Sequence, residues 1–173
     1  MKSETKIKLA IGLSVFFSSW LVYLRTMAPT IVFWDAPEFI SVSYILGIPH
    51  PPGYPVPALI GRVATIVLPF FKEVALRVNM IPALFAACST ALVYLLTVKL
   101  IGHWRGQPKD RMDEVVMHLA GLGAALTLAF RSSWWDNAID AKGLVYGTAI
   151  LMMCLTIWIV LRWQERIGQE GNR

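Results

Sequence analysis

Four apolar runs, each close to twenty residues long, constrain this 173-residue chain more than any other feature. A helix of about 20 apolar residues spans a bilayer core, where each backbone polar group must be bonded within the protein. Only 16% of the residues are charged, too few to cover the surface of a soluble domain of this length. We therefore predict an all-α integral membrane protein with one membrane domain, residues 1–173. Its transmembrane helices are expected at about 8–27, 75–101, 114–131 and 143–163.

The distribution of basic residues predicts the orientation of these helices. If residues 28–74 form one large outer loop and the N-terminus is cytoplasmic, ten of the 16 Lys and Arg lie on the inner side. The positive-inside rule favours this arrangement. Residues 56–71 are apolar but short, and a span there would move the loop HWRGQPKDR outside and remove the bias. We therefore expect an interfacial or re-entrant helix near 56–68. The ten inner cations are Lys2, Lys6, Lys8, Lys99, Arg105, Lys109, Arg111, Arg162, Arg166 and Arg173.

Other sequence features narrow the class of protein further. No small-residue cleavage site follows the first apolar run, so we expect an uncleaved first helix. The four apolar runs predict a multi-pass protein. We expect it in a bacterial inner or plasma membrane. The net charge of +5 does not indicate nucleic-acid binding, because the basic residues lie at the ends of apolar runs. Cys88 and Cys154 lie inside apolar segments and are expected to be unpaired core residues. Trp134 and Trp135 flank the outer end of the third helix and suggest interfacial anchors.

The stretch WDAPEF places Asp35 and Glu38 just after the first apolar run. Two interpretations remain open. Asp35 with Glu38 three residues later fits a capping box, with a helix over 36–46 that ends at Gly47. Carboxylates at the outer membrane face are also costly, and one placed there could accept a proton from a hydroxyl nucleophile.

A second polar feature, PHPPGYP, occupies residues 49–55. The prolines stiffen the backbone around His50, and Gly53 permits a tight turn. Such a rigid loop suits a binding site built from His50 and Tyr54, although a simple turn with a surface histidine explains the pattern as well.

Together these motifs resemble the DUF2723 family, which includes the TMEM260-like protein O-mannosyltransferases. The likeness rests on the order and spacing of D-x-x-E, HPPGYP and RVN, the last at residues 77–79. It covers most of residues 20–163 and implies the N-terminal portion of a GT-C glycosyltransferase fold. Relatives usually carry glycine where Trp34 and Pro37 stand here. Later in the chain they tend to read A-V-E-A-E-x-Y, where this sequence has Asp140 and Lys142.

The resemblance implies an enzyme that transfers a sugar, mannose for example, from a polyprenyl or dolichyl phosphate to a hydroxyl of a protein or glycan. Asp35 would be the catalytic base and Glu38 its partner. A leaving lipid phosphate needs cations. No cofactor is expected, and no motif demands a metal.

A non-catalytic subunit that binds a lipid-linked sugar, or a truncated inactive relative, remains an alternative, and a second chain could supply further spans. The substrate-binding candidates are His50, Tyr54, Arg62, Arg77, Asp140 and Lys142.

Overall fold

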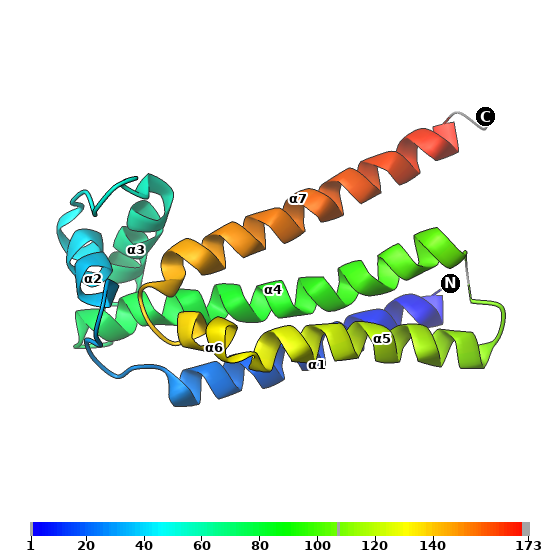
Figure 1. Cartoon of the computed structure of the whole chain (residues 1–173), viewed down its shortest axis with the longest axis horizontal. Helices are drawn as coiled ribbons and strands as arrows, with labels where there is room; N and C mark the ends of the chain where they lie inside the picture. The colour runs from blue at the N-terminus through cyan, green and yellow to red at the C-terminus, as the bar shows by residue number, and fades with distance from the viewer. Residues whose placement is uncertain (1, 107, 171–173) are drawn as a thin grey trace.

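The computed structural model describes residues 2–106 and 108–170, and this part of the chain contains helices and no strands (Figure 1). Gln107 and the predicted inner cation Arg173 lie outside the described residues. The predicted all-α fold is confirmed. The helices are α1 (Lys2–Thr26), α2 (Ala36–Ile45), α3 (Pro55–Val67), α4 (Val74–Arg105), α5 (Arg111–Phe130), α6 (Ser132–Ala138) and α7 (Gly143–Glu170).

Four of these helices are long and apolar enough to cross a membrane, which agrees with the predicted number of spans. The N-terminus, the α4–α5 connection and the C-terminal end of α7 lie at one end of the bundle (Figure 1). The helices α2 and α3 lie at the opposite end, as an outer loop over 28–74 requires. Which end faces the cytoplasm stays a prediction. The candidate spans are Thr5–Thr26, Val74–Arg105, Arg111–Phe130 and Gly143–Ile167.

The 32-residue helix α4 is the centre of the bundle and contacts the six other helices. Small side chains permit this close packing, because helices in a membrane associate through van der Waals contact rather than the hydrophobic effect. Ala83, Ala86 and Ala87 are buried against α1 and α6 around Tyr23. The Tyr23 hydroxyl donates a hydrogen bond to the Ala129 carbonyl at 2.9 Å, which joins α1 to α5.

The short helix α3 has the length and surface of an interfacial helix. Its 13 residues extend about 20 Å, less than the roughly 30 Å of a bilayer core, and it lies across the direction of α4 (Figure 1). Its inner face packs on α2 so closely that a Cβ on Gly61 would lie 2.0 Å from Ser43 Oγ. Its outer face is an apolar stripe that consists of Val56, Leu59, Val63, Ile66 and Val67. This arrangement favours the interfacial position over a span.

The segment between α5 and α7 differs from the expectation. It contains α6, a seven-residue helix that the sequence pattern did not predict. Trp134 was expected to be an interfacial anchor, but it is buried in the core cluster around Tyr23. Trp135 instead donates its indole N–H to Thr26 Oγ1 at 3.0 Å. The segment thus packs inward, against the end of α1. Cys88 and Cys154 are both free thiols, as predicted.

Candidate active site

The chain between α1 and α2 is fixed at Ala28. The Ala28 N–H donates to the Ile139 carbonyl at 2.9 Å, and the buried Asn79 side chain donates to the Ala28 carbonyl at 2.9 Å. Asn79 belongs to the RVN motif on α4. These bonds join three parts of the chain that are distant in sequence. The motif therefore helps to position the segment that leads to Asp35.

The start of α2 is not a capping box, and this interpretation is wrong. Asp35 occupies the N-cap position, but its side chain makes no capping hydrogen bond. The Glu38 carboxylate also points elsewhere, to His50. At the other end of α2, Leu46 rather than Gly47 takes the left-handed conformation, with φ of 56°. Both carboxylates are thus available for contacts other than helix capping.

The Asp35 carboxylate forms an ion pair with Lys142. Lys142 Nζ lies 3.2 Å from Asp35 Oδ2, and the two side chains are 33% and 37% exposed. The ammonium also lies 6.0 Å from the centroid of the Trp34 ring. The structure therefore joins the first acid of D-x-x-E to the lysine that stands where relatives carry a second acid. The pair remains accessible to a substrate.

Asp140 positions Lys142. Among the described residues, it forms no hydrogen bond with Asp35. Its Oδ1 accepts the backbone N–H of Lys142 at 2.8 Å. Burial raises the pKa of this carboxyl above its ordinary value, while the hydrogen bonds from Lys142 and Gly143 act in the opposite direction. The turn that follows is very tight, because a Cβ on Gly143 would lie 1.5 Å from the Asn137 carbonyl oxygen. This turn fixes the direction from which the lysine reaches Asp35.

Glu38 holds His50 at two points. Its Oε1 accepts the backbone N–H of His50 and its Oε2 lies at the ring Nδ1, both at 2.6 Å. The hydrogen bond to the His50 ring, followed by that to its backbone, lowers the pKa of the Glu38 carboxyl. Glu38 is therefore engaged with the HPPGYP loop, and the His50 side chain remains 42% exposed.

Aromatic rings pack against His50, the partner of Glu38. The rings of His50, Tyr54 and Phe39 lie 5.7–6.0 Å apart, between centroids. Phe39 is 2% exposed and belongs to the core cluster with Val78 and Leu144, so the loop rests on the bundle itself. Tyr54 contributes a packing surface here, and its backbone takes a positive φ of 37° at the start of α3.

The two predicted arginines are bonded elsewhere. Arg62 donates to the Tyr44 carbonyl, at the end of α2. Arg77 donates to the carbonyls of Phe71 and Thr65 at 2.7 and 3.0 Å, and so holds the α3–α4 connection. Within the described residues, neither arginine shares a hydrogen bond or ion pair with Asp35 or His50. Their present contacts are structural, and a role in binding phosphate stays a prediction.

Three of these side chains have the composition of a metal site. Ligand atoms of Asp35, Glu38 and His50 all lie within 4.8 Å of one another. Both Glu38 oxygens already accept hydrogen bonds from His50, and Asp35 Oδ2 pairs with Lys142. A cation would have to displace these contacts, so the geometry gives no separate support for a metal. The absence of a metal requirement stays a prediction.

A cavity of about 450 Å³ adjoins the Asp35–Lys142 pair. Sequence reasoning did not assign Tyr146 or Asp136 to the site. Tyr146 follows Lys142 by four residues and α7 begins between them, so helical spacing was the signal that could have identified it. Trp34, which is 85% exposed, supplies an aromatic wall. The cavity is lined by Ala28, Val32, Trp34, Asp136, Asn137, Ile139, Asp140, Lys142 and Tyr146.

Comparisons with known proteins agree with the predicted resemblance. Protein O-mannosyl-transferase TMEM260 of Mus musculus is 28% identical over 154 residues, which cover 89% of this chain and 20% of that protein. Protein O-mannosyl-transferase tmem260 of Dictyostelium discoideum is 28% identical over 94 residues, or 53% of this chain and 12% of that protein. No solved structure matches. This chain thus spans about one fifth of the mouse relative.

The family model described as the protein O-mannosyl-transferase TMEM260 N-terminal domain matches residues 35–173. The match begins at Asp35 and includes Glu38, the HPPGYP loop and Lys142. The chain belongs to the family of the protein O-mannosyl-transferase TMEM260 N-terminal domain.

Proposed function

We propose that this chain is the site-bearing portion of a membrane glycosyltransferase of GT-C type. The donor is a sugar, mannose for example, on a polyprenyl or dolichyl phosphate, and the acceptor is a hydroxyl of a protein or glycan. The names of the mouse and Dictyostelium relatives support O-mannosyl transfer. Four candidate membrane helices support a donor that resides in the lipid phase.

One observation carries the proposal most directly. An accessible carboxylate, Asp35, is held 3.2 Å from the Lys142 ammonium beside a cavity of about 450 Å³. Sugar transfer from a lipid phosphate needs a proton acceptor for the attacking hydroxyl and a cation for the departing phosphate. Asp35 and Lys142 supply these two groups next to each other. The exposed rings of Trp34 and Tyr146 line the cavity and offer flat surfaces for a sugar.

The proposed reaction is a single displacement. The acceptor oxygen forms a bond to the anomeric carbon as its proton passes to the Asp35 carboxylate. The bond between that carbon and the phosphate oxygen breaks, and the lipid phosphate leaves with the electron pair. A single displacement of this kind inverts the configuration of the anomeric carbon. When the donor phosphate attracts the Lys142 ammonium, the Asp35 carboxylate loses its ionic partner and is released to accept the proton.

Glu38 acts through His50 in this proposal. Its two hydrogen bonds fix the HPPGYP loop, and the exposed imidazole edge of His50 contacts the donor phosphate or sugar. Glu38 is therefore a positioning residue, whereas Asp35 touches the reacting atoms. The different partners of Asp35 and Glu38 support different roles for these two carboxylates, which lie three residues apart in the sequence.

The variant Asp35→Asn tests the assignment. Removal of a general base typically lowers the rate on the order of 100- to 10,000-fold. Loss of an exposed ion pair costs only about 0–1 kcal/mol of stability, so the variant should still fold. Sugar transfer from a polyprenyl-phosphate donor would be measured in membranes of the native host. The control is Glu73→Gln, an exposed carboxylate on the same outer loop. Transfer at the wild-type rate by Asp35→Asn would refute the catalytic assignment.

A further inference from the structure

Glu38 and His50 form a carboxylate–imidazole pair whose chemistry the proposed function uses only in part. Glu38 Oε2 lies 2.6 Å from His50 Nδ1, and Oε1 accepts the backbone N–H of His50 at the same distance. The other ring nitrogen, Nε2, forms no hydrogen bond with a described residue, and the side chain is 42% exposed. A carboxylate that holds one ring nitrogen in this way orients the other for proton transfer.

The ionic partners of Asp35 and His50 suit opposite roles in proton transfer. Lys142 Nζ lies 3.2 Å from Asp35 Oδ2, and this ion pair contains Asp35 as a carboxylate, the form that accepts a proton. The contact with Glu38 is an ion pair when both ring nitrogens of His50 carry a proton, and this is the form that donates one. A base and an acid are thus placed side by side.

Asp35 and His50 are close enough to exchange a proton through one water. An oxygen of Asp35 lies within 4.8 Å of a ring nitrogen of His50. Proton transfer uses a direct hydrogen bond or one intervening water, and a gap of this size suits the second. The rings of Phe39 and Tyr54 lie 6.0 and 5.7 Å from the imidazole, between centroids, and hold it in place. A proton accepted by Asp35 can therefore reach His50 after each reaction.

We propose that His50 is the general acid of the sugar transfer, an inference that rests on the proposed function. As the bond from the anomeric carbon to the phosphate oxygen breaks, its electron pair stays on that oxygen, which takes the proton from His50 Nε2. The acceptor hydroxyl gives its proton to Asp35. That proton then passes through the water to His50, which restores the Asp35 carboxylate and the protonated imidazole. The proton lost by the acceptor thus balances the one gained by the lipid phosphate.

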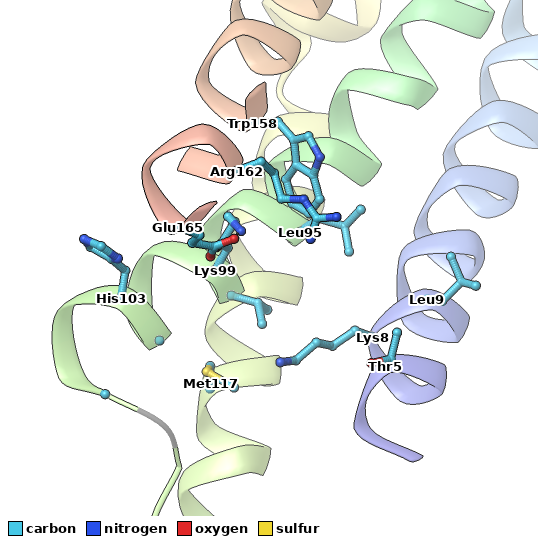
Figure 2. Close-up of a pocket in the computed structure, with 13 residues that line it drawn as sticks. Thr5, Lys8, Leu9, Leu95, Lys99, His103, Met117, Trp158, Arg162 and Glu165 are labelled. Carbon is cyan, nitrogen blue, oxygen red and sulfur yellow. Dashed lines mark hydrogen bonds and ion pairs between the residues drawn. The ribbon is translucent and has the colours of Figure 1, made fainter. Parts of the chain in front are cut away.

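The variant His50→Gln separates proton donation from donor binding. Its amide can donate a hydrogen bond to the phosphate but cannot give up a proton. We expect kcat to fall about 100-fold, with little change in the KM for the polyprenyl-phosphate donor. The control is His103→Gln, because His103 is exposed and lines another cavity at the opposite end of the bundle (Figures 1 and 2). A raised KM with an unchanged kcat would overturn the proposal, since His50 would then only bind the donor.

The pH dependence of kcat gives a second measurement. A general acid acts only when protonated, so the wild-type kcat should fall as the pH rises through the titration of the acid. The titratable groups that face His50 are Glu38 on α2, Asp35 just before α2 and Tyr54 at the start of α3. His50→Gln keeps all three, so we expect it to lose the alkaline fall in kcat. A fall of wild-type size in this variant would assign the titration to another group and overturn the proposal.

Free imidazole tests whether the missing group is the imidazole itself. Added imidazole should raise the kcat of His50→Ala severalfold and leave that of His103→Ala unchanged. Failure to do so, in a His50→Ala protein that melts at the wild-type temperature in detergent, would overturn the proposal. Asp35→Asn is assayed in the same membranes. Wild-type transfer by Asp35→Asn would overturn both the proposed function and this inference, whereas its loss, together with a full kcat in His50→Gln, would overturn this inference alone.

Discussion

At the scale of single residues, the site combines groups that sequence patterns did and did not reveal. The motif D-x-x-E drew attention to Asp35 and Glu38, but local spacing suggested a capping box. The actual partners are Lys142 for Asp35 and His50 for Glu38, and Lys142 is distant from Asp35 in the sequence. Contacts of this kind depend on the packing of α2 against α4 and α7. A single sequence contains no local signal for them.

Trp34 has a backbone conformation that is unfavourable for its residue type. It takes a φ of 68°, a conformation that glycine adopts freely and that costs other residues about 1–2 kcal/mol. The resemblance described above leads to the expectation of glycine here, and the positive φ supplies a physical reason for that expectation. The tryptophan ring, close to Lys142, accompanies this strain. Strained residues of this kind cluster at functional sites.

We predict that Trp34→Gly is more stable than Trp34→Ala by about 1 kcal/mol, after allowance for the greater chain entropy of glycine. Both variants remove the ring, so only backbone freedom separates them. Thermal unfolding in detergent would measure the difference. An alanine variant as stable as the glycine variant would show that the positive φ imposes no cost.

The Glu38–His50 contact predicts a specific dependence on pH. Because the pKa of Glu38 is lowered in the folded protein from its ordinary value of 4.5, the contact stabilises the fold above pH 4.5. This contribution is lost as the pH falls through the folded pKa. Glu38→Gln should therefore be less stable than the wild type at neutral pH, and the two should converge in acid. Melting temperatures between pH 3 and pH 8 would test this, and a constant difference would contradict it.

At the scale of helices, the sequence predicted what apolar runs alone determine. Long apolar runs must form helices in a bilayer. The ends predicted for the four candidate spans therefore lie within a few residues of the observed ends. The helix α6 was missed because two tryptophans beside a polar stretch resemble an interface anchor. Its burial depends on α1, which lies far away in the sequence. The tight turn at Gly143 was not predicted either, because the nearby Asn137 carbonyl comes against this position only once the turn has formed.

At the scale of the whole molecule, the ends of the bundle differ in chemistry. One end holds the carboxylates, the HPPGYP loop and the interfacial helix α3. The other holds both chain termini, the α4–α5 connection and most of the basic residues (Figure 1). The two relatives described above come from a mouse and a slime mould, so they give no support to the expected bacterial inner membrane. The orientation stays a prediction from the charges.

We predict that the end with α2 and α3 faces away from the cytoplasm. In a chain with Cys88 and Cys154 replaced by Ala, Phe70→Cys should react with a membrane-impermeant maleimide from the non-cytoplasmic side. Lys109→Cys, in the α4–α5 connection, should react only after permeabilisation. Both positions are exposed, so accessibility to the reagent depends on the side of the membrane. The reverse pattern would invert the orientation.

If the proposed function holds, the apolar stripe on α3 has a consequence for how the site meets its lipid-linked donor. Because these five side chains face outward, we expect them to rest on the lipid surface, which would then set the height of the neighbouring α2 above the hydrocarbon. The phosphate of a lipid-linked donor would lie at that same surface. The site and the donor phosphate would then lie at the same depth, and they would meet by diffusion in the plane of the membrane. A membrane that thins or thickens shifts both together, so their alignment is preserved.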